Sequence, residues 1–135
     1  MPKGTEHPHA LLLRPDSTFE VLDWPSSGSG LPTLYRAIEC TAVDVVRITP
    51  ELDMWLNDEG MIDGTPINRW ATAVYAAHRP PHQWYHGNVV LTGGADSHGN
   101  TIGLTDQQVI DLTADHLDIA ISLMAVKIPT QRTKK

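Results

Sequence analysis

Short apolar runs bounded by turn residues predict β-strands in the first half of the chain. Residues 10–14 and 18–23 read as two strands joined by the turn sequence P-D-S. Residues 43–48 are rich in β-branched side chains, and residues 52–57 alternate apolar with polar side chains, as in a half-buried strand. The pattern therefore predicts four strands, two before and two after an intervening helical segment.

Three segments instead place apolar residues three and four positions apart, which is the spacing of an amphipathic helix. The first, residues 31–40, has Pro32 at a position suited to the first helical turn. The second, residues 66–77, begins with Pro66 and is preceded by Thr65, a candidate N-cap. We therefore expect helices over both segments.

The third helix is predicted to begin at Thr105, because Thr105 and Gln108 have the spacing of a capping box. Before it, residues 87–92 contain the uninterrupted apolar run V-V-L, typical of a central strand buried on both faces. The predicted order of elements is ββ-α-ββ-α-β-α. This order indicates an α+β fold in which about three helices pack on a mixed, mainly antiparallel sheet.

The size and composition of the chain suit one folded domain. It has 135 residues, of which 41% are hydrophobic and 19% charged. We expect the domain to span residues 10–126, between a flexible N-terminus over 1–9 and a flexible basic tail over 127–135. No apolar run approaches the length of a membrane span, and no signal-peptide segment is apparent. Cys40 is the only cysteine, which excludes an internal disulfide and fits a reducing cytoplasm.

Charge is unevenly distributed along the chain, whose net charge is −6. Residues 127–135 hold four of the ten basic residues, so the rest of the chain carries six basic and sixteen acidic groups, a balance of −10. An acidic body repels nucleic-acid phosphates, which disfavours direct nucleic-acid binding. It suits a soluble acidic domain, one that faces a basic protein surface, or one that imitates DNA phosphates.

Four short motifs carry a resemblance to a known family. They are N-D-E-G at residues 57–60, P-I-N-R-W-A-T at 66–72, G-N-V-V-L-T-G at 87–93 and G-L-T-D at 103–106. Together they resemble an uncharacterised family of phages, plasmids and actinobacteria, catalogued as a domain of unknown function with the number three-eight-four-six in the DUF series. The resemblance covers roughly residues 10–123 and brings no established activity. It implies a phage or mobile-element accessory protein in the host cytoplasm, a class that often acts against host defence.

Several polar residues in and beside these motifs suggest a ligand site. The start of the second predicted helix combines free backbone N–H groups with a guanidinium, which is the chemistry of an anion site. The glycine turn after the buried strand is a place where chains often leave room for a ligand. If the two segments meet, they would line a pocket for a small anionic molecule such as a nucleotide. The candidate ligand-binding residues are Asn57, Asn68, Arg69, Thr72, Thr92 and Asp96. The other interpretation is ordinary capping and turn chemistry.

The segment H-R-P-P-H-Q-W-Y-H, residues 78–86, suggests a second surface. Its three histidines have the four-residue spacing of zinc ligands on a helix, but the two prolines exclude a regular helix, so no metal site is predicted. The mixture of histidine and aromatic residues instead fits an exposed contact loop. The candidate partner-contact residues are His82, Trp84, Tyr85 and His86.

Binding fits the sequence better than catalysis. Asp58, Glu59 and Asp63 form an acidic group at a predicted hairpin tip, where solvated turn residues are the simpler explanation. Neither a P-loop nor a G-x-S-x-G nucleophile motif occurs, and no cofactor is predicted. A hydrolase that uses Asp96 or His86 is the remaining catalytic alternative.

The sequence therefore favours a non-enzymatic binder that modulates a host protein, with counter-defence as one such role. The alternative is a protein that binds, and so sequesters, a small anionic ligand or nucleotide. An exposed apolar face beside Trp84 would favour a homo-oligomer.

Overall fold

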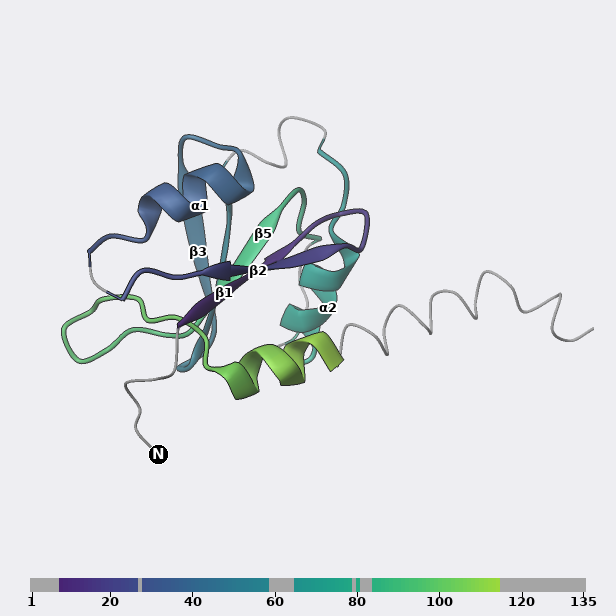
Figure 1. The fold of residues 1–135 in the computed structure, drawn as a ribbon. Helices are drawn as coiled ribbons and strands as arrows, with labels where there is room; N and C mark the ends of the chain where they lie inside the picture. The colour runs from purple at the N-terminus through teal and green to yellow at the C-terminus, as the bar shows by residue number, and fades with distance from the viewer. Residues whose placement is uncertain (1–7, 27, 59–64, 79, 81–83, 115–135) are drawn as a thin grey trace, which may run out of the picture.

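The computed structural model describes residues 8–26, 28–58, 65–78, 80 and 84–114, and their secondary structure follows the predicted order (Figure 1). The elements are β1 (His9–Leu13), β2 (Phe19–Asp23), α1 (Leu31–Ile38), β3 (Val43–Thr49), β4 (Leu52–Asn57), α2 (Arg69–Ala76), β5 (Val89–Thr92) and a helical segment at residues 106–114. The predicted order ββ-α-ββ-α-β-α is confirmed.

The five strands form one sheet in the order β2-β1-β5-β4-β3, and each neighbouring pair is antiparallel. β5 lies in the centre, although it is the last of the five along the chain. All four of its residues are buried, as expected for a central strand covered on both faces. The mainly antiparallel α+β fold is confirmed, and the described strands include no parallel pair.

Helices cover both faces of the sheet (Figure 1), and β1 shows how the core is divided. Leu11 and Leu13 pack in a cluster with α2 and the helical segment 106–114. Ala10 and Leu12 pack in a second cluster with α1. Alternate residues of a strand point to opposite faces, so one strand contributes to both cores. We call these two sides of the sheet the α2 face and the α1 face.

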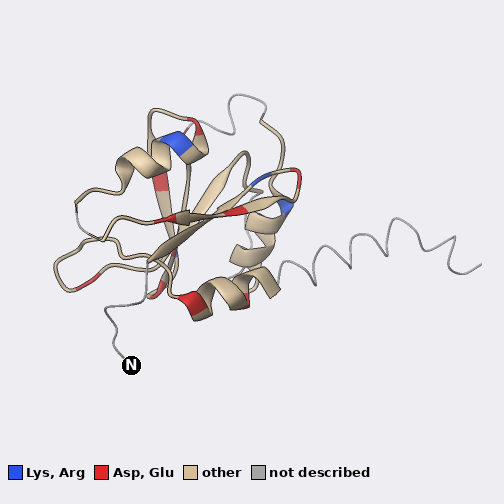
Figure 2. Cartoon of the chain, viewed as in Figure 1, with Lys and Arg blue, Asp and Glu red and all other residues tan. Residues whose placement is uncertain are grey.

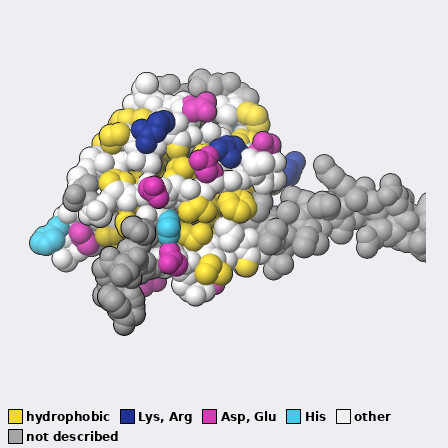
Figure 3. Space-filling view, in the orientation of Figure 1, with side chains coloured by type: hydrophobic (Ala, Val, Ile, Leu, Met, Phe, Trp, Pro, Cys, Tyr) yellow, Lys and Arg dark blue, Asp and Glu magenta, His cyan; other side chains and the backbone are white. Residues whose placement is uncertain are grey.

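β2 is one edge of the sheet, and most of its side chains are exposed. Its apolar residues Phe19 and Val21 are 39% and 44% exposed. Figure 3 shows several hydrophobic side chains together on this side of the molecule. Between them, Glu20 accepts a charged hydrogen bond from Arg14 at 2.6 Å. Charge on an edge strand opposes the addition of a further strand from another chain.

The predicted helix start at Thr65 and Pro66 is wrong, because α2 begins three residues later. The Pro66 carbonyl accepts a hydrogen bond from the backbone N–H of Gly87 at 2.9 Å, and Ile67 forms an antiparallel bridge with His86. These contacts hold the chain before α2 against the chain before β5. A tertiary pairing thus overrides a local capping signal.

The helical segment 106–114 begins as predicted, with a capping box. The backbone N–H of Thr105 donates to the side-chain oxygen of Gln108 at 2.9 Å, and the backbone N–H of Gln108 donates to the Thr105 hydroxyl at 3.1 Å. Each residue therefore satisfies a backbone donor of the other. Of the helices that the structure describes, none has the length and apolar character needed to cross a membrane.

Candidate functional site

Asn68 and Thr72, two of the predicted ligand residues, are committed to the fold by hydrogen bonds. Asn68 is fully buried and is the N-cap of α2, where its side-chain oxygen accepts a backbone N–H of the first turn at 3.0 Å. Its amide donates to the carbonyls of Leu13 at 3.0 Å and Gly87 at 2.8 Å. The Thr72 hydroxyl accepts the backbone N–H of Tyr85 at 3.0 Å. These bonds tie α2 to β1 and to the chain before β5.

The other predicted ligand residues lie elsewhere. Thr92 is fully buried and points to the α1 face, across the sheet from α2. Arg69 is exposed in the first turn of α2, and Asn57 is the half-buried last residue of β4. Asp96 is exposed in the loop after β5. The six residues therefore do not form the single pocket that the sequence predicts, because they are divided between the two faces of the sheet.

The predicted partner-contact residues are also divided. Trp84 is 54% exposed, whereas Tyr85 is 2% exposed and its ring stacks on Tyr75 with 5.5 Å between the centroids. Burial raises the pKa of the Tyr85 phenol, with a smaller contribution from Tyr75. Tyr85 is therefore a core residue and not a contact residue. His86 is half-buried, with Nδ1 2.8 Å from the Thr65 carbonyl oxygen.

Of the three histidines at the four-residue spacing, His78 and His86 lie in the described residues, and each has Nδ1 close to a backbone carbonyl oxygen. His78 places Nδ1 3.0 Å from the Val74 carbonyl oxygen, and His82 lies outside the residues that the structure describes. Within the described ranges, no group of three His, Cys, Asp or Glu side chains is arranged to hold a metal ion.

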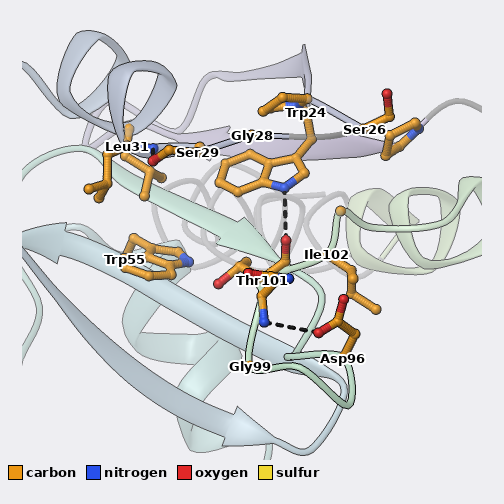
Figure 4. A pocket seen from close by; sticks show the side chains of 16 residues that line it. Trp24, Ser26, Gly28, Ser29, Leu31, Trp55, Asp96, Gly99, Thr101 and Ile102 are labelled. Carbon is orange, nitrogen blue, oxygen red and sulfur yellow. Dashed lines mark hydrogen bonds between the residues drawn. The ribbon is translucent and has the colours of Figure 1, made fainter.

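A different candidate site is a cavity of about 650 Å³ on the α1 face (Figure 4). Most of its lining comes from three segments far apart in the sequence: residues 24–26 and 28–31 at the approach to α1, Trp55 of β4, and Asp96 with residues 99–103 after β5. The volume falls within the range of about 300–1,000 Å³ that is usual for small-molecule sites. Of the six predicted ligand residues, Asp96 alone lines this cavity.

Trp24, the residue after β2, forms one wall of the cavity. Its indole N–H donates to the Thr101 carbonyl at 3.3 Å, and the residue is 5% exposed. Gly30 faces this ring, where a Cβ would lie 2.2 Å from two of the indole carbons. Glycine at position 30 therefore allows the chain entering α1 to lie directly against Trp24.

Trp55 forms a second wall and is half-buried. Its indole N–H donates to the Thr92 hydroxyl at 2.9 Å, and that hydroxyl donates to the Gly93 carbonyl at 3.0 Å. The indole N–H groups of Trp24 and Trp55 are thus both used within the protein. Both rings line the cavity, and a hydrogen bond of each indole N–H helps to fix the orientation of its ring.

The loop of residues 93–103, which forms the opposite wall, is held against the body by close backbone approaches. A Cβ at Gly94 would lie 2.0 Å from the Pro50 carbonyl oxygen, and a Cβ at Gly103 would lie 2.9 Å from the His9 carbonyl oxygen. Glycine at both positions lets the loop contact the β3–β4 turn and β1. The wall is therefore positioned by the sheet and does not depend on a ligand.

Asp96 supplies a fixed negative charge at the cavity. Its carboxylate accepts hydrogen bonds from the backbone N–H groups of Asn100 and His98, both at 2.9 Å. These bonds, that of Asn100 first, stabilise the ionised form and lower the pKa of the Asp96 carboxyl below its ordinary value of 3.8. A carboxylate with a lowered pKa is a weak base, which suits an electrostatic role better than proton transfer.

Sequence reasoning does not identify Trp24 or Trp55 as site residues. Trp24 reads as the end of a strand and Trp55 as one position of an alternating strand, so neither has a local signal of function. The cavity exists because segments distant in sequence meet; Trp24 and its hydrogen-bond partner Thr101 are 77 positions apart. The one available signal is the presence of four tryptophans in a small chain.

Residues 8–117 of the chain match the family described as Domain of unknown function (DUF3846). A search of the curated proteins and a search of the solved structures both give no match.

Proposed function

The chain belongs to this family of domains of unknown function, and we propose that it is a non-enzymatic protein that binds a small molecule in the cavity between Trp24, Trp55 and the loop of residues 93–103. The observation that carries the proposal is the pair of tryptophans whose rings line one cavity and whose N–H groups are already bonded. Preformed concave sites with aromatic walls and a few polar groups are the usual form of ligand pockets.

Binding is favoured over catalysis by the groups that line the cavity. Asp96 is the one ionisable side chain among the described lining residues, so no second ionisable group of the lining pairs with it. A general base or nucleophile needs a partner that activates it. The lining supplies shape and aromatic surface instead.

A thermal-shift screen of a small-molecule library, with neutral, cationic and anionic members, tests the proposal. A ligand at a hundredfold excess over its Kd stabilises the folded state by about 2.7 kcal/mol, which raises Tm by several degrees. We expect hits whose shift is lost in Trp55→Ala. Trp84→Ala is the matched control, because it removes an exposed tryptophan that does not line the cavity. A screen without any hit that depends on Trp55 contradicts the proposal.

A second candidate function is contact with a host protein through Trp84, in an accessory protein of a phage or other mobile element. Trp84 is 54% exposed, and tryptophan is the side chain most enriched at the energetic centres of protein interfaces. The net charge of −6 suits a partner with a basic surface.

A pull-down with the wild-type chain and two variants tests this second candidate. The expected result is a single protein that the wild type retains, that Trp84→Ala loses and that Ile110→Ala keeps. Ile110 is the matched control because it is an exposed apolar residue on a different element, 57% exposed. Equal recovery with Trp84→Ala and the wild type argues against a role for Trp84.

A further inference from the structure

We infer that the ligand of the cavity carries an organic cation, a quaternary or protonated amine, held against Trp24 and Trp55 with Asp96 as its counter-ion. The inference rests on the proposed function and names the ligand class. Figure 4 shows Trp24, Trp55 and Asp96 bordering the same cavity from different sides. The cationic ligand inferred here differs from the anionic ligand that the sequence suggests at Arg69. Arg69 does not line the cavity.

The charge of the cavity lining is negative. The described residues that line it include Asp96 and contain no Lys, Arg or His. The carboxylate is held in its ionised form by two backbone N–H groups, so it keeps its charge throughout the neutral range. The described lining offers an anionic ligand no Lys, Arg or His side chain to offset this charge, whereas a cationic ligand is attracted by it.

The N-terminus of α1, which also borders the cavity, has few donors left for an anion. The backbone N–H of Leu31 donates to the Ser29 hydroxyl at 3.1 Å, and Pro32 has no N–H. The first two residues of the helix therefore present no free donor. The usual reason for an anion to bind at a helix start is largely removed here.

The aromatic walls favour a cation for a separate reason. The face of an indole ring carries negative electrostatic potential, and tryptophan is the best side chain for holding quaternary ammonium groups. Since both N–H groups are bonded internally, the rings interact with a ligand through their π surface and not as hydrogen-bond donors. Two such rings and one carboxylate are the groups with which proteins hold alkylated amines.

Charges near the cavity do not reverse this preference. On the same face of the sheet, Arg47 lies 3.1 Å from the buried carboxylate of Asp53, so its charge is offset locally. The loop of residues 93–103 holds Asp96 and no Lys or Arg (Figure 2). Its one histidine, His98, acts electrostatically on Asp96 and is not among the residues that line the cavity. A chain with net charge −6 also attracts cations at long range.

The experiment compares choline with neohexyl alcohol, its isostere in which a carbon replaces the nitrogen, and with adenosine monophosphate as an anion. Tryptophan fluorescence of the full chain is titrated with each probe. We expect choline to bind at least about fivefold more tightly than neohexyl alcohol, since a cation over tryptophan is worth roughly that factor. We expect the monophosphate to bind more weakly than choline.

Three variants assign the effect to the cavity. Asp96→Asn keeps an acceptor for the loop N–H groups, and we expect it to weaken choline about threefold or more while leaving neohexyl alcohol unchanged. Asp111→Asn removes the same charge from the helical segment on the other face and is expected to change neither affinity. Trp55→Ala is expected to weaken both probes.

The outcomes separate this inference from the proposed function. Equal affinity for choline and neohexyl alcohol, or tighter binding of the monophosphate, overturns the cationic ligand and leaves a small-molecule site in place. The cationic ligand is also overturned if choline fails to bind while a neutral or anionic library compound binds in a manner that depends on Trp55. If no small molecule binds in a manner that depends on Trp55, both proposals fall together.

Discussion

Asn68 is a residue for which a ligand contact and a structural contact compete as explanations. Its side chain caps α2 and donates to the buried carbonyls of Leu13 and Gly87. We expect Asn68→Ala to lower the free energy of unfolding by about 2–4 kcal/mol, because it removes a cap and leaves two buried acceptors without their donors. Urea denaturation monitored by circular dichroism measures the change.

Arg69→Ala, at the next position, is the control for this prediction. Arg69 is exposed, and substitutions at exposed positions usually change the free energy of unfolding by less than about 0.5 kcal/mol. If Asn68→Ala proves as mild as Arg69→Ala, then the hydrogen bonds of Asn68 do not stabilise the fold as argued.

A second prediction at the scale of single residues concerns the pH dependence of the hydrogen bonds that Asp96 accepts. Its pKa is lower in the folded state than its ordinary value of 3.8, so its hydrogen bonds stabilise the loop fully above that pH. This contribution is lost as the pH falls through the folded-state pKa, which lies below 3.8. A carboxyl-carbon NMR titration is expected to place the Asp96 midpoint below 3.8, and a midpoint at or above that value would contradict it. In Asp96→Asn the loop amide signals of His98 and Asn100 should lose this acid transition.

At the scale of elements, two similar local signals have different outcomes. Thr105 begins a helix as predicted, because its partner in the capping box lies three residues away and needs nothing from the rest of the fold. Thr65 with Pro66 has a comparable signal, but the chain there pairs with residues 86–87 and the helix begins after Asn68. Helix boundaries are predictable from the sequence where the cap is local, and not where a distant segment competes for the same backbone groups.

The same substitution at these two threonines tests that explanation. Thr105→Ala is expected to lower the free energy of unfolding by about 1 kcal/mol, the usual cost of losing a capping hydroxyl. Thr65→Ala is expected to change it by less than about 0.5 kcal/mol, since Thr65 contacts His86 through its backbone carbonyl and does not cap α2. Thermal or urea unfolding of both variants measures the difference, and equal losses would show that Thr65 has a capping role.

At the scale of the whole molecule, the strands and their order follow from short-range patterns, whereas the cavity does not. The run V-V-L predicts that β5 is central because only a strand covered on both faces can be apolar throughout. The cavity depends on how the segment before α1 and the loop after β5 close over one face of the sheet. Trp24 donates a hydrogen bond to Thr101, which is 77 positions away in the sequence. The pattern of apolar residues within each of the two segments gives no indication of this contact. A site made by distant contacts is therefore hidden from sequence patterns even when each wall is in a well-predicted element.

The sheet also joins its two cores into one cooperative unit, which neighbouring residues of β1 can test. Leu12 packs on the α1 face at 4% exposure, and Leu13 packs on the α2 face at 0%. We expect Leu12→Ala and Leu13→Ala each to lower the free energy of unfolding by about 2–5 kcal/mol, the usual cost of a buried leucine truncation. β1 and β5 contribute side chains to both cores. A substitution that removes packing on one face of the sheet should therefore destabilise the cores on both faces to the same extent. Circular dichroism and tryptophan fluorescence should then give coincident urea transitions for each variant. Separate transitions in Leu12→Ala, with the α1 face unfolding first, would show that the two cores are independent.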